Sequence, residues 1–296
     1  MLYFSSLLKT NPKYSLAAEN LFSALSNSGE KFTLFDGAKD IWARDYMPVK
    51  TKSGKYVSFR YEPSYLADEP QLKTIFKTDI APHFTLPVTY SNINLDGGNV
   101  VFSPSRSNAV ITDRVFSENP KYYKSTLLTE LENLLKAEII IIPSLKSDMT
   151  GHADGVVRFV NENTVIGNAS PYKNGYEQKV KKVLKKHGVS VIDFPYFDFK
   201  GLSAVGSYLN FLETENHIFL PVFGDAQDET AEYKEHGFKI VTCPVCGNET
   251  LDMYWICEHC GWEYDNTRSE DEYSAANSNT IKEYREKYLK QGFKKG

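Results

Sequence analysis

Three aspartates spaced almost evenly along the chain are the residues best suited to chemistry with a cation. Asp45, Asp96 and Asp154 are 51 and 58 residues apart, and Asn210 follows after a further 56 residues. Carboxylates that converge in one pocket repel one another unless a cation lies between them. If a repeated fold brings these positions together, they predict a cation site. The alternative is that the aspartates only cap turns or pair with nearby arginines, namely Arg44, Arg114 and Arg158.

Each aspartate lies in a short motif of its own. The three motifs are Ile-Trp-Ala-Arg-Asp-Tyr-Met-Pro at 41–48, Asn-Leu-Asp-Gly-Gly-Asn-Val at 94–100 and Gly-His-Ala-Asp-Gly-Val-Val-Arg-Phe at 151–159. Paired glycines let the backbone approach a ligand closely. If the third motif is a strand, His152 and Asp154 project from the same face, because they are two residues apart. A histidine beside a carboxylate can transfer a proton while the carboxylate holds a cation.

All four cysteines of the chain lie close together near its C-terminus. They form two C-x-x-C pairs separated by ten residues, Cys243 with Cys246 and Cys257 with Cys260. Two such pairs suit a tetrahedral Zn²⁺ site, because each pair supplies two thiolates from one tight turn. The alternative to a zinc site is a redox-active C-x-x-C. His259, between the last two cysteines, could also be a ligand but is expected to be exposed. A secreted protein would scatter disulfides through its core, so this clustering indicates a metal and a cytoplasmic protein.

The elements that must position these residues recur along the chain. Short strand-like runs follow polar turns at intervals of 53 to 55 residues, and each turn is preceded by another strand-like run, which predicts hairpins. Helical patterns such as 125–135 and 175–186 are followed by apolar strands such as 138–142 and 189–192. The unit is therefore strand–strand–helix–strand, and its copies should stack around an axis. The four turns are at Gly54, Asn108, Asn163 and Asn216.

Composition excludes several classes of protein. The 296 residues are 41% apolar and 24% charged, with a formal net charge of −4. A nucleic-acid partner needs a concentrated basic surface, and the two basic runs, 179–186 and 290–295, are predicted to be solvated helix faces. No apolar stretch approaches the ~20 residues that span a membrane, and the N-terminus lacks the features of a signal peptide. We therefore expect neither a nucleic-acid partner nor a membrane.

Together the three motifs resemble the agmatine deiminase and bacterial peptidyl-arginine deiminase family, whose patterns are W-x-R-D, (E/D)-G-G-N and G-H-x-D-x-x-x-R-F. Segments 206–211 and 222–229 are similar to that family as well, so the resemblance covers about residues 1–240. It implies an α/β fold, the five-bladed α/β propeller (pentein) of the guanidino-group-modifying enzymes. Four of its units are countable here.

The resemblance also implies roles for individual residues. Asp45 and Asp154 would bind the two sides of a planar guanidinium, whose fork of N–H donors suits paired carboxylates. His152 would protonate the leaving ammonia and then activate water, and Asp96 would orient the histidine or contact the substrate. Trp42 would pack against the face of the cation, or else is a core tryptophan.

The family chemistry further needs a cysteine thiolate from the fifth unit, in a G-G-x-x-(N/H)-C segment near the end of the chain. Extending the repeat from Asn210 reaches residues 260–265, where no Gly-Gly precedes a cysteine. The fifth unit is thus missing or replaced. We expect a protein that binds a guanidinium group but is catalytically impaired. One alternative is an active guanidine deiminase that uses Cys257 or another nucleophile, and a second is a zinc-ribbon interaction module on a non-catalytic scaffold.

The C-terminal segment 243–292 resembles a cysteine-rich CPCC domain, with Val245 where that family commonly has a further cysteine, and with a helix at 280–288. The expected domains are 1–242, a deiminase-like propeller, and 243–296, a zinc ribbon with a C-terminal helix. Structural zinc in the ribbon is the expected cofactor, and none is expected at the deiminase-like site. The expected partners are a small guanidino ligand (agmatine or arginine-like) or an arginyl peptide, and a protein partner or second copy bound through the ribbon.

Overall fold

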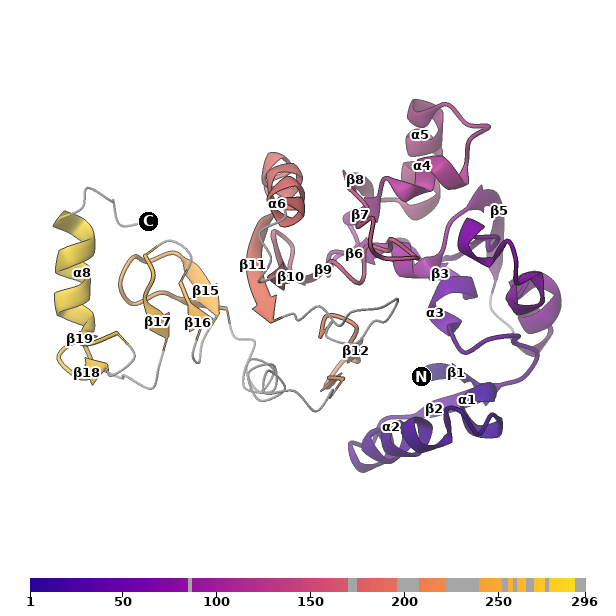
Figure 1. Ribbon diagram of the computed structural model, residues 1–296, viewed down its shortest axis with the longest axis horizontal. Helices are drawn as coiled ribbons and strands as arrows, with labels where there is room; N and C mark the ends of the chain where they lie inside the picture. Colours follow the sequence, from indigo (N-terminus) through magenta and orange to yellow (C-terminus); the bar gives the residue numbers. More distant parts are fainter. Residues whose placement is uncertain are drawn as a thin grey trace.

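A computed structural model describes residues 1–84, 87–169, 175–195, 208–221, 240–251, 255–257, 260–264, 269–274 and 277–290. Its largest part is a series of small sheets joined by helices (Figure 1). Three of these sheets have three strands and the same topology: the first strand pairs antiparallel with the second, and the second pairs parallel with the third. The strands are β3 (Val49–Lys50), β4 (Tyr56–Arg60) and β5 (Val88–Asn94); β6 (Val101–Phe102), β7 (Asn108–Thr112) and β8 (Glu138–Ile142); β9 (Val157–Asn161), β10 (Thr164–Ala169) and β11 (Ser190–Pro195).

Helices connect the parallel strands, as the sequence predicts. Helix α5 (Lys124–Leu135) leads into β8, and α6 (Tyr176–Lys186) leads into β11. Leu127, Leu131 and Leu135 are four residues apart on α5 and fully buried, so one face of this helix covers the sheet. In Figure 1 these helices lie outside the strands that they join. The remaining short elements of this region are α4 (Arg114–Glu118), η1 (Ser64–Leu66), η2 (Pro70–Leu72), η3 (Phe76–Ile80) and η4 (Ala81–His83).

The N-terminus forms part of a further unit that the sequence analysis did not count. Strands β1 (Leu2–Ser5) and β2 (Phe32–Phe35) are parallel and are joined through α1 (Leu7–Thr10) and α2 (Ser15–Asn27). This arrangement corresponds to the second strand, helix and third strand of the other units. The last hairpin, β12 (Leu212–Glu213) with β13 (Ile218–Phe219), begins another unit.

A polar contact joins the two ends of the series. The Glu30 carboxylate, directly before β2, accepts a hydrogen bond of 2.6 Å from the Thr214 hydroxyl and lies 2.9 Å from His217 Nδ1. Thr214 and His217 belong to the turn between β12 and β13. The first and last units are therefore neighbours, and the series of units closes on itself.

Apolar clusters lie between successive units rather than in one common core. Among the described residues, one cluster joins Phe35 of β2 to Tyr46, and the next joins Val57 of β4 to Ile111 of β7. A third holds Ile140 of β8 and Leu184 of α6. A fourth includes Ile166, Phe194, Tyr208 and Phe211. Each interface thus fixes the position of one unit relative to the next. It thereby also fixes the positions of the loops that precede the first strand of each unit.

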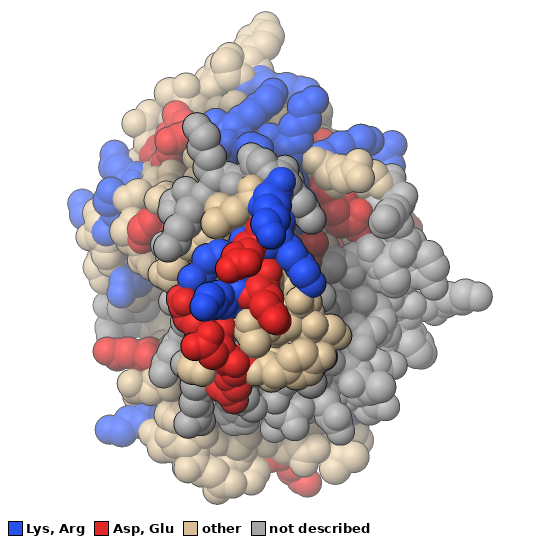
Figure 2. Space-filling view, turned by 90° about the vertical axis from the view of Figure 1, so that its left-hand side faces the viewer, with Lys and Arg blue, Asp and Glu red and all other residues tan. Residues whose placement is uncertain are grey.

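The C-terminal part has its own small core. Its elements are β14 (Ile240–Thr242), β15 (Glu249–Leu251), β16 (Trp255–Ile256), β17 (Glu263–Tyr264), β18 (Tyr273–Ser274), β19 (Asn279–Thr280) and α8 (Ile281–Lys290). The cysteines pack with Val245, Trp262, Ile281 and Tyr288. The end of the molecule that carries α8 shows lysine and arginine side chains intermixed with acidic ones (Figure 2). In the described part of the chain, no helix has the length and apolar character needed to cross a membrane.

Candidate functional site

The three aspartates occupy the same structural position in successive units. Asp45 lies in the short helix α3 (Ala43–Tyr46) just before β3, and Asp96 directly precedes the turn η5 (Gly97–Asn99) and β6. Asp154 lies in the turn before β9. Asn210 likewise precedes β12, and it is exposed. The near-regular spacing therefore reflects loops that lead into the first strand of each unit.

The condition that the third motif is a strand holds only for its second half, because β9 begins at Val157. His152 and Asp154 lie before β9, in a segment closed by the hydrogen bond from Val156 N–H to the Ala153 carbonyl. Backbone N–H groups of this segment donate to residues of η5 and not to a neighbouring strand. Asp154 N–H donates to the Gly98 carbonyl over 3.2 Å, and Ala153 N–H donates to Asn99 Oδ1 over 3.2 Å. His152 and Asp154 still reach a common place, but through a turn.

That common place is the α-carbon of Gly98. A β-carbon added there would lie 2.5 Å from Asp45 Oδ1, 2.7 Å from His152 Nδ1 and 3.0 Å from Asp154 Oδ2. Three side chains from the two flanking units therefore converge on one backbone atom of the unit between them, and a residue larger than glycine would collide with all three. Gly98 N–H also donates to Asp45 Oδ1 over 3.0 Å. The second glycine of the motif at 94–100 is thus required by the pocket.

Asp96 and His152 form a close pair beside this point. His152 Nε2 lies 2.7 Å from Asp96 Oδ2, and His152 Nδ1 lies 3.6 Å from Asp45 Oδ1. Both His152 and Asp96 are buried, at 5% and 7% exposure. The contact with Asp96 orients the imidazole so that Nδ1 is directed toward Asp45 and Gly98. The orienting role that the family resemblance implies for Asp96 requires such a contact, and the role itself stays a prediction.

Burial and like charge shift the ionisation of these groups. Burial raises the pKa of Asp45 to about 7, although His152 and the Gly98 N–H act against that rise. Burial likewise raises the pKa of Asp154 above its ordinary value, opposed by His152 and Arg44. Burial alone would lower the pKa of His152, but the hydrogen bond to Asp96 and the surrounding carboxylates raise it to about 9. Near neutral pH the pocket therefore contains one cationic histidine among three carboxyl groups, those of Asp45, Asp96 and Asp154.

The arginines do not neutralise these carboxylates by direct pairing. Arg44 Nη2 donates to the Val100 carbonyl over 2.7 Å. The Arg114 guanidinium lies 3.2 Å from Glu118, and that of Arg158 lies 3.7 Å from Glu213. The aspartates converge on Gly98 instead, which argues against the alternative that they only pair with these arginines.

Trp42 is 60% exposed, directly before α3. A core tryptophan is therefore the wrong alternative for this residue. Its contact with a bound cation stays a prediction, which its place beside the helix that carries Asp45 supports.

Sequence reasoning missed Tyr65, which lies in η1. Its hydroxyl donates a hydrogen bond of 3.0 Å to Asp96 Oδ2, the oxygen that also contacts His152. No motif marks Tyr65, because it lies between β4 and β5 in a segment that is not repeated in the other units. Only the position of η1 in space connects it to the site.

The four cysteines form a second candidate site. The sulfur atoms of Cys243 and Cys260 are 3.6 Å apart, as are those of Cys246 and Cys257, and all four lie within 4.8 Å of one another. Tetrahedral coordination at a Zn–S distance of about 2.3 Å places sulfurs roughly 3.8 Å apart. The donor set thus fits a tetrahedral metal ion.

The two cysteine pairs are built alike. Gly247 and Gly261 each follow the second cysteine of a pair, with φ of +80° and +75°. Each donates its N–H to the carbonyl of the first cysteine, Cys243 or Cys257. Glycine adopts such left-handed conformations without strain, so the turns can direct both thiols of a pair to one point. His259 and the motif segments 206–207 and 222–229 lie outside the described residues.

The matches to known families divide the chain into the same two parts, one with the three aspartates and one with the four cysteines. Residues 13–235 match the sequence profile of a family described as Porphyromonas-type peptidyl-arginine deiminase, and residues 241–295 match that of the cysteine-rich CPCC family. No curated protein sequence matches the chain.

Solved structures of agmatine deiminases share the fold. The C. jejuni agmatine deiminase aligns with a TM-score of 0.60 and 17% identity, over 79% of this chain and 82% of that one. A cysteine-to-serine variant of the C. jejuni enzyme with substrate bound aligns at 0.57 and 18%, over 77% and 81%. The agmatine deiminase of Enterococcus faecalis aligns at 0.57 and 19%, over 74% and 78%. The likeness confirms the pentein-type α/β propeller predicted from the sequence.

Proposed function

Because the chain belongs to the family of Porphyromonas-type peptidyl-arginine deiminases, we propose that its pocket binds a guanidinium group between Asp45 and Asp154. The observation that carries this proposal is the convergence of both carboxylates on Gly98. A guanidinium is planar and presents five N–H donors in a fixed fork, so two carboxylates from different loops can bind its two sides. The positive charge of the ligand would offset the repulsion between the buried acids.

Agmatine, an arginine-like small molecule or an arginyl peptide is the ligand class we propose. Among structures with the same fold, the C. jejuni variant has its substrate bound and the E. faecalis protein is an agmatine deiminase. All these ligands share the guanidinium head that Asp45 and Asp154 would bind. In this proposal the exposed ring of Trp42 covers the face of the bound cation, a contact worth ~1–2 kcal/mol when desolvated.

Binding without efficient turnover is the second part of the proposal. Deimination needs a thiolate that attacks the guanidinium carbon. All four cysteines of the chain lie between residues 243 and 260, and their sulfurs cluster as one donor set. A thiolate held by a metal in a tetrahedral cage is a poor nucleophile for this step. His152 and Asp96 would then polarise and orient a bound ligand without completing the reaction.

For the C-terminal module we propose a structural zinc ion held by Cys243, Cys246, Cys257 and Cys260. The metal would supply no chemistry at the guanidinium pocket, and would hold a module whose core is otherwise small. The gathering of every cysteine in one thiolate site supports a reducing, cytoplasmic location. Exposed Tyr273 and Leu289 on this module are available for contact with a protein partner or a second copy.

Calorimetry with agmatine and with an N-acetylated arginine amide tests the binding proposal. The variants Asp45→Asn and Asp154→Asn are each expected to weaken binding about 10–100-fold, because each removes a charge-assisted pair of hydrogen bonds. The control is Asp193→Asn, which removes a half-exposed acid that pairs with Lys181. Equal binding by all four proteins, or no binding to either ligand, would contradict the proposal.

Release of ammonia from the same ligands tests the proposed lack of turnover. We expect none above background in the wild-type protein. Turnover that is lost in Cys257→Ala and kept in Cys243→Ala would show instead that Cys257 acts as a nucleophile.

A further inference from the structure

The contact between Asp96 and His152 has a third member. Asp96 Oδ2 lies 2.7 Å from His152 Nε2 and accepts a hydrogen bond of 3.0 Å from the Tyr65 hydroxyl. One carboxylate oxygen therefore serves two donors. A donor that binds a carboxylate withdraws part of its negative charge, which weakens its attraction for a neighbouring cation. Tyr65 and His152 thus compete for the charge of Asp96.

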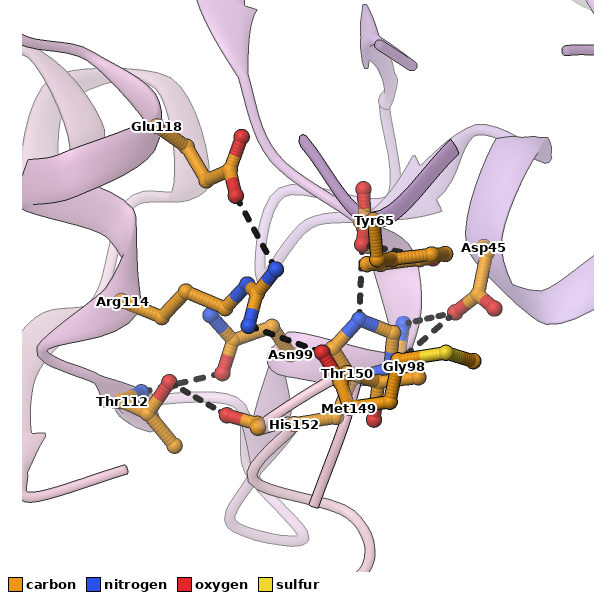
Figure 3. A network of polar contacts seen from close by, with 12 residues as sticks. Asp45, Tyr65, Gly98, Asn99, Thr112, Arg114, Glu118, Met149, Thr150 and His152 are labelled. Atoms are coloured by element: carbon orange, nitrogen blue, oxygen red, sulfur yellow. Dashed lines mark hydrogen bonds and ion pairs between the residues drawn. The ribbon is translucent and has the colours of Figure 1, made fainter. Parts of the chain in front are cut away.

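The structure holds Tyr65 in place from the next unit. The Arg114 guanidinium carbon lies 5.4 Å from the centre of the Tyr65 ring, and Arg114 is itself held by Glu118 at 3.2 Å and by the Met149 carbonyl at 2.9 Å. Figure 3 shows this network, with Arg114 between Glu118 and the group around Tyr65 and His152. The Tyr65 hydroxyl is therefore kept on Asp96 by contacts that extend away from the ligand site.

We propose that Tyr65 is a positioning residue that acts through Asp96 and limits the proton affinity of His152. The Asp96 contact holds Nε2 of the imidazole, so the opposite nitrogen, Nδ1, is the one directed at the pocket. By sharing Asp96 Oδ2, the tyrosine reduces the stabilisation that Asp96 gives to the cationic form of His152. The inference rests on the proposed function only in giving Nδ1 a guanidinium ligand to face.

Other charged groups around His152 also affect its protonation. Asp45 faces Nδ1 at 3.6 Å, and Asp154 approaches the same point at Gly98. Both stabilise the imidazolium, as does Asp96. Arg114 is directed at the Tyr65 ring and at Glu118, and Arg44 donates to the Val100 carbonyl while its charge acts on Asp154. Tyr65 is thus a neutral donor to Asp96, the acid in direct contact with His152 Nε2.

The test is a titration of His152 by NMR in the ligand-free, full-length protein. In Tyr65→Phe, Asp96 loses one hydrogen-bond donor, and the pKa of His152 is expected to rise by about 0.5–1 unit, or about 3–10-fold in its acid constant. The matched control is Tyr176→Phe, which also removes a partly buried tyrosine hydroxyl, but one that donates to the Pro143 carbonyl over 2.9 Å. The control should leave the pKa of His152 unchanged.

A second pair of variants separates this effect from simple packing. The Tyr65 and His152 rings meet edge to face, with centroids 6.2 Å apart, and phenylalanine keeps that contact. In an Asp96→Asn background, adding Tyr65→Phe should leave the pKa of His152 unchanged, because the shared carboxylate is gone. An unchanged or lowered pKa in Tyr65→Phe alone, or an equal rise in both backgrounds, would overturn the proposal. The measurement needs no ligand, so a failure of guanidinium binding would not affect its outcome.

Discussion

At the scale of single residues, the pocket depends on acids whose ionisation in the unliganded protein is unfavourable. Asp45 and Asp154 come from different loops and meet at Gly98, and burial raises the pKa of both. A guanidinium can pair with these carboxylates only when they are ionised. The protein therefore has to release protons in order to bind the proposed ligand, and this cost depends on pH.

We predict that agmatine binding strengthens as the pH rises toward neutrality. Because the pKa of Asp45 is about 7, the association constant should fall about tenfold for each pH unit below that value and level off above it. Calorimetry at pH 6 in two buffers of different ionisation enthalpy should show release of close to one proton per ligand. In Asp40→Asn, which removes a partly buried acid that caps the Trp42 N–H, the pH dependence should remain. A binding constant that is independent of pH between 5.5 and 8 would contradict the assignment of Asp45.

At the scale of elements, the closure of the series of units rests on a small number of polar contacts. Glu30 is the described residue that links the N-terminal β1–β2 pair to the β12–β13 hairpin, through Thr214 and His217. The hydrogen bond from Thr214, followed by that from His217, lowers the pKa of Glu30 below its ordinary value of 4.5. A lowered pKa in the folded state means that the contact stabilises the protein above that ordinary value, and that the stabilisation is lost as the pH falls.

Glu30→Gln is therefore expected to lower the Tm at pH 7 and to have little effect near pH 3. Glutamine can still accept from Thr214, but it carries no charge to attract His217. Thermal unfolding followed by circular dichroism at the two pH values measures the difference. The control is Glu19→Gln, an exposed glutamate of α2, which should leave the Tm unchanged at both. An equal loss at both pH values would show that the charge of Glu30 has no part in closure.

The elements also show what a sequence can and cannot reveal. The hairpins at Gly54, Asn108, Asn163 and Asn216, and the helices α5 and α6, could be predicted because turn residues and apolar periodicity are local signals. The N-terminal unit was missed because it lacks the hairpin that marks the others. The turn at 151–156 was not predicted, because its pattern of residues does not reveal that its N–H groups bind η5.

The residues of the site, too, could be predicted only where the sequence carries a local or repeated signal. Asp45, Asp96 and Asp154 could be found because the repeat itself puts them at equivalent positions. Tyr65 could not, because its hydrogen bond to Asp96 arises from a connection that only one unit has. The exposure of Trp42 likewise depends on tertiary packing around α3, which its neighbours in sequence do not determine.

At the scale of the whole molecule, the propeller and the C-terminal module differ in what stabilises them. The apolar clusters of the propeller consist of residues up to 220, whereas the cluster that contains the cysteines consists of residues 243–288. In the described part of the chain, therefore, no apolar cluster spans both. The clusters of the propeller pack between units, whereas the cluster of the C-terminal module is built around its four cysteines. We therefore expect the two parts to respond differently to metal removal.

We predict that a strong zinc chelator unfolds the C-terminal module of the full-length protein and leaves the guanidinium pocket intact. Trp262 is 1% exposed and packs edge to face against Tyr284 at 5.2 Å, so its near-UV circular dichroism should be lost when the module opens. One zinc ion should be released per chain, because the four thiolates form a single cluster. The NMR signal of His152 and the affinity for agmatine should be unchanged, and re-addition of zinc should restore the signal of Trp262. Loss of agmatine binding together with the metal would show instead that the module contributes to the pocket.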